Sequence, residues 1–276
     1  MQNVKINTKS LEGLCQVGLS ISSCKFSRRN KAKTAELNKD FTSPKDTATS
    51  QLIPRAALKD LEIVERELRQ HVEAFSVAFG NVRVMPSRLI PQYENKLRDL
   101  IERHKEEKTA FLDIYDGLME KERQERNGDF PEHLYYSKDG LNGKFSVNPS
   151  LLPLSFNFNK VEDEVMGKLI KESVEDGLKS VESDLFERVA SGIASVSNYL
   201  NGKSKKFCDK SLTNLQEIAR QIKELNLTGN AELDKIAASF ESLAQVSPEN
   251  IRKEKAVNSE VKSQVAEIEK TLAGII

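Results

Sequence analysis

The sequence contains one dense run of basic residues, and phosphate binding is the chemistry that such a run could carry out. The run consists of Lys25, Arg28, Arg29, Lys31 and Lys33. Ammonium and guanidinium groups of this kind hold the phosphates of a nucleic acid or nucleotide. Interleaved aromatic residues for base stacking are missing, so the solvated start of a loop is the favoured interpretation. The candidate phosphate or nucleic-acid contacts are Lys25, Arg28 and Arg29.

A second phosphate-binding signal fails on its spacing. Residues 201–206 have the sequence NGKSKK, which contains the Gly-Lys-Ser that ends a phosphate-binding loop. The full motif needs a glycine five residues before Gly202, where this chain has Ser197, and it needs a preceding strand. The periodicity predicts a helix there instead. We interpret the segment as the turn that ends that helix.

The remaining polar residues do not form a recognisable catalytic or metal-binding pattern. His71 and His104 fall on or beside apolar helical stripes, and His133 follows Pro131 in a predicted loop. The sequence lacks a His-Glu-x-x-His motif, and its cysteines have no identifiable base. We therefore expect no catalytic, cofactor-binding or metal-binding residues and predict that the protein is not an enzyme. A hydrolase assembled from scattered carboxylates is the competing class.

Composition predicts a soluble protein of the cytoplasm, or of the host cytoplasm if a phage encodes it. Lys plus Arg and Asp plus Glu each number 42 in 276 residues, so no global field attracts nucleic acid or anionic lipid. The three cysteines are scattered and form no Cys-x-x-Cys pair, which favours a reducing compartment. Neither a signal peptide nor a run of eighteen apolar residues is present. No membrane contact is expected.

The N-terminal part predicts one strand followed by a linker. Cys15, Val17, Leu19 and Ile21 alternate with polar residues or glycine, which is typical of a half-buried strand. We place a strand segment at residues 1–26, a flexible linker at 27–51 and a helical bundle at 52–276. A β-like insertion is expected at about residues 133–160.

Two long amphipathic helices are predicted next, joined by GNVRVMP. The first begins at Pro54 and ends at Gly80-Asn81. The second begins near Ser87 and ends at Asn127-Gly128, with a heptad spacing that indicates a coiled-coil seam. We expect the pair to fold back as an antiparallel hairpin. The seam of the second helix comprises Tyr93, Leu97, Leu100, His104, Phe111, Tyr115 and Leu118.

Four further helices are predicted after the insertion. The first spans about residues 165–200 and is interrupted by Gly167, Gly177 and Gly192, which either bend it or let a neighbouring helix approach. Two more carry apolar stripes over residues 212–225 and 233–243. The last begins at Ser247-Pro248-Glu249, a serine cap with proline in the first turn.

The insertion itself predicts a second short strand. Leu154, Phe156 and Phe158 alternate with polar residues, and Asp-Gly and Asn-Gly turns precede them. Because two isolated strands are marginal in water, we expect this strand to pair with the N-terminal one. A pore-forming tongue is an alternative, although it is too short to cross a bilayer. Its residues would be Leu151, Leu152, Leu154, Phe156 and Phe158.

In order along the chain, several phrases resemble an uncharacterised family of helical proteins of phages, plasmids and integrative elements, domain of unknown function 3150. These phrases are GLSIS, LIPRAALKDLEIVERELRQHVEAF, PQYENKLRDLIERHKEEKTAFLDIYD, LSFNF and SDLFERVASGIASVSNYLNGKSKKFCDKSLTNLQEIARQI. Members often carry a Trp after the opening strand, where this chain has Phe26. Such genes often lie near those for a MoxR-type AAA+ ATPase and a von Willebrand-type A-domain protein.

The resemblance and the helical pattern together set the expected function. We expect a mainly α, elongated antiparallel bundle with a two- or three-stranded β element. It would serve a phage or mobile element as a non-catalytic interaction protein, with a MoxR-type AAA+ ATPase as the implied partner. The alternatives are a DNA-associated accessory protein that uses Lys25, Arg28 and Arg29, and the α-helical pore-former.

Overall fold

The computed structural model describes all of the 276 residues except 1–10, 30, 40–46, 127–129, 131, 133–134, 155–163, 203–208 and 276. The chain forms two compact units. The first, which we call the bundle unit, comprises Met1–Gly18, Glu73–Ile90 and Leu151–Ile276. The second, the hairpin unit, comprises Leu19–Val72 and Pro91–Ser150. Helices dominate both units, which confirms the predicted mainly α class.

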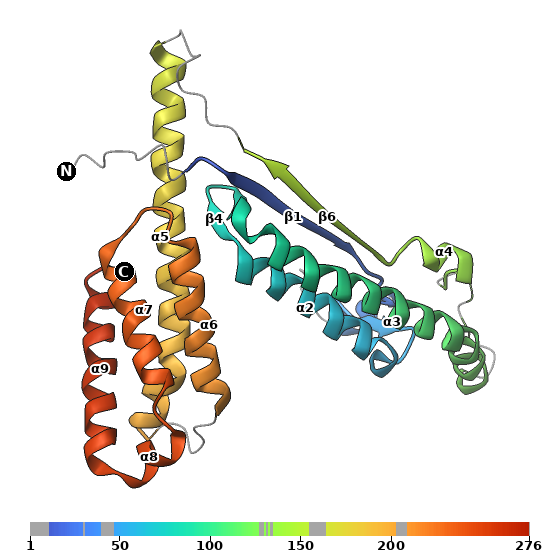
Figure 1. Ribbon diagram of the computed structural model, residues 1–276. Coiled ribbons are helices and arrows are strands. Elements are labelled where there is room, and N and C mark those ends of the chain that lie inside the picture. Colours follow the sequence, from blue (N-terminus) through green and yellow to red (C-terminus); the bar gives the residue numbers. More distant parts are fainter. Residues whose placement is uncertain are drawn as a thin grey trace. The chain divides into compact units, whose positions relative to one another are not determined.

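A small sheet joins strands from distant parts of the sequence (Figure 1). Its strands are β1 (Leu14–Ser22), β4 (Val77–Phe79), β5 (Val82–Pro86) and β6 (Ser146–Pro153), in the order β4-β5-β1-β6. The sheet therefore has four strands where the sequence predicted two or three. β6 lies beside β1, as expected for the insertion. The predicted strand residues from 155 to 158 lie outside the described residues.

The link between the first two long helices is itself a β-hairpin, which the sequence analysis missed. Gly80 has a φ of +59°, so Gly80-Asn81 makes the tight turn between β4 and β5. Phe79 therefore lies on strand β4 and not on the first predicted helix. The prediction that the first helix reaches Gly80 was wrong, because a turn signal after an apolar run fits a hairpin as well as a helix end.

The hairpin unit is built on α2 (Lys59–Phe75) and α3 (Ile90–Glu125). Their antiparallel packing, predicted from the sequence, appears in cross-helix contacts between Glu67 and Arg103 and between His71 and Tyr93. All predicted seam residues of α3 are buried except Leu118, which is half-buried. The seam is where apolar side chains leave water, and that burial is the main favourable term that holds the two helices together.

The bundle unit contains α5 (Glu164–Leu200), α6 (Asp209–Leu225), α7 (Ala231–Ala244), α8 (Pro248–Lys253) and α9 (Lys255–Ala273). α5 packs against β4, α6, α7 and α9 (Figure 1). The predicted final helix is two helices. Ser247 caps α8 as expected, accepting a hydrogen bond from Asn250 N, but Glu254 has extended backbone angles and separates α8 from α9.

Two glycines of α5 are sites of close approach. A Cβ at Gly177 would lie 2.5 Å from the ring of Phe79, and a Cβ at Gly192 would lie 2.5 Å from Cδ1 of Ile218. Nothing lies within 4 Å of a Cβ at Gly167. Of the two predicted explanations, close approach therefore accounts for Gly177 and Gly192. At Gly177, however, the neighbour is a strand and not a helix.

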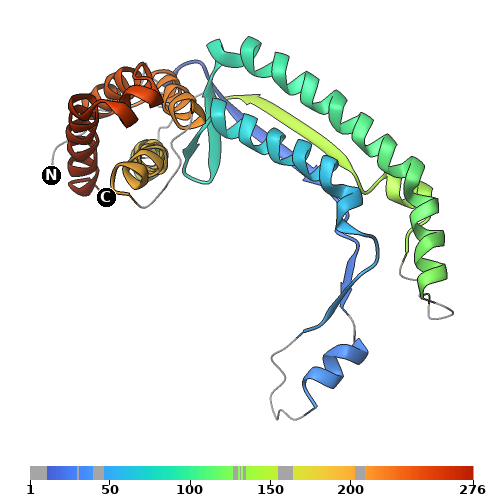
Figure 2. The same ribbon diagram turned by 90° about the horizontal axis from the view of Figure 1, so that it is seen from below.

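The predicted flexible linker contains secondary structure. Residues 25–51, which we call the arm, include β2 (Ser27–Arg29), α1 (Lys31–Leu37) and β3 (Thr49–Gln51). β2 and β3 pair antiparallel, with Arg28 opposite Ser50. Figure 2 shows the two strands side by side with α1 beyond their far end. The polar composition that predicted a loop is equally compatible with a short two-stranded ribbon, because such a ribbon needs no apolar face of its own when its root is anchored elsewhere.

Candidate functional site

The arm that carries the predicted phosphate contacts is anchored by Phe26. This side chain is 3% exposed and packs against Phe111 and Tyr115 of α3, with ring centroids 5.6 and 5.8 Å away. Its φ is +45°, a conformation that costs roughly 1 kcal/mol or more for a bulky residue. The packed ring holds this backbone in place. Leu52 and Ile53 are buried in the same cluster.

Hydrogen bonds close the root of the arm. The N–H of Leu52 donates to the carbonyl of Phe26 at 2.8 Å, and the hydroxyl of Tyr135 donates to the carbonyl of Leu52 at 2.8 Å. Gln51 Nε2 donates to the carbonyls of Lys25 and Ile53. These bonds fix β2 and β3 at the end of the ribbon where the arm begins and ends.

The far end of the arm is ordered by a buried threonine. Thr34 of α1 is 7% exposed, and its Oγ1 accepts a hydrogen bond from the N–H of Ala48 at 3.0 Å. Asn38 Nδ2 donates to the carbonyl of Thr34 at 2.7 Å. These bonds tie α1 to the start of β3, so α1 and the ribbon form one folded element.

The arm exposes its basic side chains. Lys25, Arg29, Lys31 and Lys33 are exposed, and the backbone of Arg28 lies in β2. The structure thus places the three predicted contacts, Lys25, Arg28 and Arg29, along one strand and its lead-in. The sequence analysis preferred a solvated loop, whereas the described residues here form a ribbon.

A cluster of half-buried charged residues lies in the bundle unit, around Asp184, and was missed by the sequence analysis. Asp184 of α5 accepts hydrogen bonds from Arg188, from Arg83 at 3.3 Å and from the N–H of Ala78 at 2.8 Å. Arg83 and Arg188 also donate to the carbonyl of Ser76 at 2.8 and 2.7 Å. The available signal was Arg83, a charged residue between two valines in an otherwise apolar hairpin strand.

The same cluster extends to α6. Arg188 donates to Oε1 of Gln221 at 2.9 Å, and Gln221 donates to Glu217 at 3.0 Å. Arg220 pairs with Glu217 at 2.6 Å and lies 5.0 Å from the centre of the Phe75 ring. The cluster therefore connects the β4–β5 hairpin with α5 and α6 inside one unit.

The electrostatics of this cluster are those of a structural network. Burial alone would raise the pKa of Asp184, but the hydrogen bonds and positive charge of Arg188, the N–H of Ala78 and the charge of Arg83 hold it below its ordinary value. A carboxylate that is ionised and fully hydrogen-bonded has little basicity left for proton abstraction. The arrangement joins elements together and offers no reactive group.

A second buried polar pair lies between α2 and α3. Glu65 and His104 are 5% and 3% exposed, and Oε1 of Glu65 lies 3.9 Å from Nε2 of His104. Neither atom has a hydrogen-bond partner among the described residues. His71 stacks on Tyr93 with centroids 5.1 Å apart, and its Nε2 lies 2.8 Å from the Tyr93 carbonyl oxygen. His71 and His104 are thus core residues, whereas His133 lies outside the described residues.

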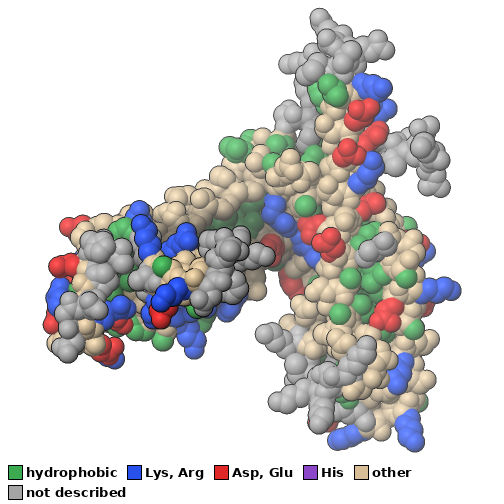
Figure 3. Space-filling model, turned by 180° about the vertical axis from the view of Figure 1, so that it is seen from behind, with side chains coloured by type: hydrophobic (Ala, Val, Ile, Leu, Met, Phe, Trp, Pro, Cys, Tyr) green, Lys and Arg blue, Asp and Glu red, His purple; other side chains and the backbone are tan. Residues whose placement is uncertain are grey.

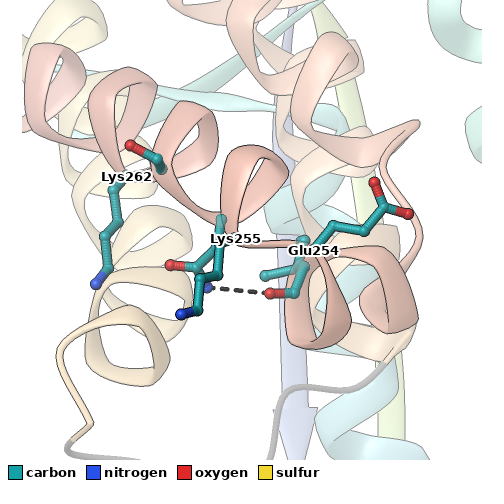
Figure 4. Close-up of a pocket in the computed structure, with 6 residues that line it drawn as sticks. Glu254, Lys255 and Lys262 are labelled. Carbon is teal, nitrogen blue, oxygen red and sulfur yellow. Dashed lines mark hydrogen bonds between the residues drawn. The ribbon is translucent and has the colours of Figure 1, made fainter.

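The described surface also has two open hollows. One, of about 370 Å³, lies between α8 and α9 and contains Lys255 and Lys262; the Glu254 carboxylate points away from both (Figure 4). The other, of about 110 Å³, lies beside Gly13 and Arg88. Both are open to solvent and lack a buried charged group.

The other motifs add no site within the described chain. No group of three or more His, Cys, Asp and Glu side chains is placed to hold a metal ion in the described part of the chain. Cys15 is buried and Cys24 half-buried, and both are free thiols. Of the NGKSKK segment, the structure describes Asn201 and Gly202; the φ of Gly202, +72°, fits the predicted helix-ending turn.

Comparison with models of known families, with curated proteins and with solved structures gives no match in any of the three cases. Among the described helices, none is both long enough and apolar enough to cross a membrane.

Proposed function

We propose that this chain is a non-catalytic interaction protein of a phage or mobile element, and that it acts as a partner or regulator of a MoxR-type AAA+ ATPase. The observation that carries the proposal is the start of α5. Every residue from 167 to 173 is exposed or half-buried, and Val174 is the first buried side chain among those that the structure describes in α5. Leu169 in this segment is 52% exposed.

A helical segment of this kind is a docking surface. About seven residues on their own would not form a stable helix in water, but here the rest of α5 continues and supports them. An exposed leucine on such a segment fits a hydrophobic groove of a partner, the usual mode of helix recognition. The segment has Lys168 and Glu172 beside Leu169, and these would form the polar rim of the contact.

The charged cluster around Asp184 supports the non-catalytic part of the proposal. Asp184 pairs with both Arg83 and Arg188, and these pairs hold secondary structure elements together. The resemblance to the mobile-element family supplies the candidate partner, since genes of that family often lie beside one for a MoxR-type ATPase.

Co-purification with the ATPase encoded beside this gene tests the proposal. A tagged full chain should recover the ATPase, and Leu169→Asp should reduce recovery at least about tenfold, the loss expected for a buried anchor of 1.4 kcal/mol or more. Leu37→Asp is the matched control, because Leu37 is 53% exposed and lies on α1. The control should recover as much ATPase as the natural chain.

Two results would overturn the proposal. One is the recovery of no ATPase by the natural chain. The other is turnover of nucleotide or phosphodiester by the purified chain, abolished by a single carboxylate substitution.

A further inference from the structure

We propose that the arm binds the backbone of double-stranded DNA, an activity independent of ATPase binding. The arm has seven lysines and arginines and three carboxylates, whereas the whole chain has equal numbers of both. Five of the seven cations fall between residues 25 and 33, and residues 13–35 contain no carboxylate. The arm therefore has a net positive charge, whereas the chain as a whole is neutral.

Three cations of the arm, Lys25, Arg29 and Lys31, differ from the exposed lysines of the helices in their ion pairing. On α3, α5 and α7, exposed lysines pair with carboxylates three or four residues away; examples are Lys105 with Glu102 and Lys179 with Asp176. In the space-filling view, basic and acidic side chains lie interspersed over the surface (Figure 3). Lys25, Arg29 and Lys31 form no ion pair with any described residue. They keep their charge available for an external anion.

The geometry of the arm favours duplex DNA among anionic partners. A two-stranded antiparallel ribbon fits the major groove of B-form DNA, whereas the major groove of duplex RNA is too deep and narrow to admit it. One strand of the ribbon carries Arg28 and Arg29, and the other carries the neutral donors Thr49, Ser50 and Gln51. Such hydroxyl and amide groups contact phosphates and base edges without repelling the backbone.

Single-stranded nucleic acid fits the arm less well. Proteins that bind single strands stack bases on exposed aromatic side chains. In the described part of the arm, the aromatic residue is Phe26, which is 3% exposed and packed against α3. Its role is to fix the root of the ribbon, and a fixed root reduces the ordering cost of binding.

The test measures binding of the full chain to a duplex of roughly 30 base pairs, about three helical turns, by fluorescence anisotropy. With about four phosphate contacts, the affinity should fall about a hundredfold as salt rises from about 50 to about 200 mM. Replacement of Lys25, Arg28, Arg29 and Lys31 by Gln should reduce the slope of log affinity against log salt by about three to four. Circular dichroism verifies folding.

A matched control separates the arm from general charge. Replacement of Lys105, Lys121, Lys168 and Lys179 by Gln removes the same charge from exposed helical positions. This control should change the slope by less than one. If the fourfold arm variant does not fold, Lys25→Gln with Arg29→Gln should reduce the slope by about two, against Lys105→Gln with Lys121→Gln.

Three results would overturn the inference. The first is an equal loss of slope in the arm variant and the control. The second is tighter binding to single-stranded than to duplex DNA of the same length. The third is binding to vesicles of mixed phosphatidylserine and phosphatidylcholine, abolished by the arm substitutions, with no binding to DNA. Co-purification with the ATPase is unaffected by any of these outcomes, so the two proposals fail separately.

Discussion

In the bundle unit the half-buried carboxylate of Asp184 accepts hydrogen bonds from two arginines and a backbone N–H, whereas in the hairpin unit Oε1 of the buried Glu65 accepts none from the described residues and lies 3.9 Å from His104. Oε2 of Glu65 forms an ion pair with Arg69 at 3.7 Å. The hydrogen bonds of Asp184 replace those that it loses with water, and the contacts of Glu65 do so much less. A carboxylate in the interior of this chain therefore holds elements together where its hydrogen bonds are complete.

The two clusters also differ in what they connect. Asp184 of α5 bonds to the β4–β5 hairpin, which is distant in sequence, and its partner Arg188 bonds to Gln221 of α6. Glu65 and His104 face each other across the seam of α2 and α3, which apolar residues already hold. Loss of Asp184 should therefore cost much more than loss of the Glu65–His104 pair.

The largest expected effect on stability is the loss of Asp184 from its cluster with Arg83 and Arg188. Asp184→Ala leaves Arg83 and Arg188 without their anion and should lower the free energy of unfolding by about 2–4 kcal/mol. Asp176→Ala is the control on the same helix, since Asp176 is 73% exposed and pairs with Lys179; its loss should cost less than about 0.5 kcal/mol. Chemical denaturation measures both. Equal losses would contradict the role given to Asp184.

A smaller effect is expected where the β4–β5 hairpin packs against α5. Gly177→Ala places a methyl group 2.5 Å from the Phe79 ring and should cost about 1–2 kcal/mol, because overpacking exceeds the gain in helix propensity. Gly167→Ala has open space and should be neutral or stabilise by up to about 1 kcal/mol. Thermal unfolding of the two variants gives the comparison. If both substitutions stabilise the chain, the β4–β5 hairpin does not pack tightly on α5.

Removal of the Glu65–His104 pair should change the free energy of unfolding in the opposite direction. Replacement of both Glu65 and His104 by Leu removes two incompletely bonded polar groups and should raise the free energy of unfolding by about 1 kcal/mol or leave it unchanged. His104→Leu alone should be destabilising, because it leaves the Glu65 carboxylate buried. A double-mutant cycle separates the two terms. Strong destabilisation by the double substitution would show that the pair holds elements together as Asp184 does.

Acid should act on the bundle unit through Asp184. Because its folded pKa lies below the ordinary value of 3.8, Asp184 contributes stability that is present above about pH 3.8 and is lost as pH falls through the folded pKa. Asp184→Asn should therefore flatten the stability curve below pH 4. The measurement is the free energy of unfolding as a function of pH. An unchanged acid slope in this variant would mean that other carboxylates produce the loss.

Alkali should act on the hairpin unit. Burial raises the pKa of Tyr93 and of Tyr115 to about 12. Each contributes stability that is present below pH 10, the ordinary phenol value, and is lost as pH rises towards 12. The absorbance of tyrosinate should show a late rise near pH 12, and Tyr93→Phe and Tyr115→Phe should each reduce its amplitude. Ionisation of all tyrosines near pH 10 would indicate a looser seam than the structure shows.

The sequence predicted the long helices α3, α5, α6 and α7 and the residues of the α3 seam. Those residues are buried apart from the half-buried Leu118, because a period of 3.6 residues on a long segment has no other stable interpretation. The Ser247-Pro248 start and the Gly202 turn were also predicted correctly, since capping depends on local backbone geometry. His71 and His104 were correctly assigned to the core.

Tertiary structure alone decided the β4–β5 hairpin, the charged cluster around Asp184 and the arm. β4 and β5 are three and five residues long, too short for periodicity to distinguish them from a helix end. Asp184 and Arg83 are 101 residues apart, and no local pattern pairs two charges at that separation. The polar sequence of the arm is compatible with a loop and with a two-stranded ribbon. The packing of Phe26 against Phe111 and Tyr115 favours the ribbon. Sequence specifies what is repeated along one element, whereas contacts between distant elements exist only once the chain has folded.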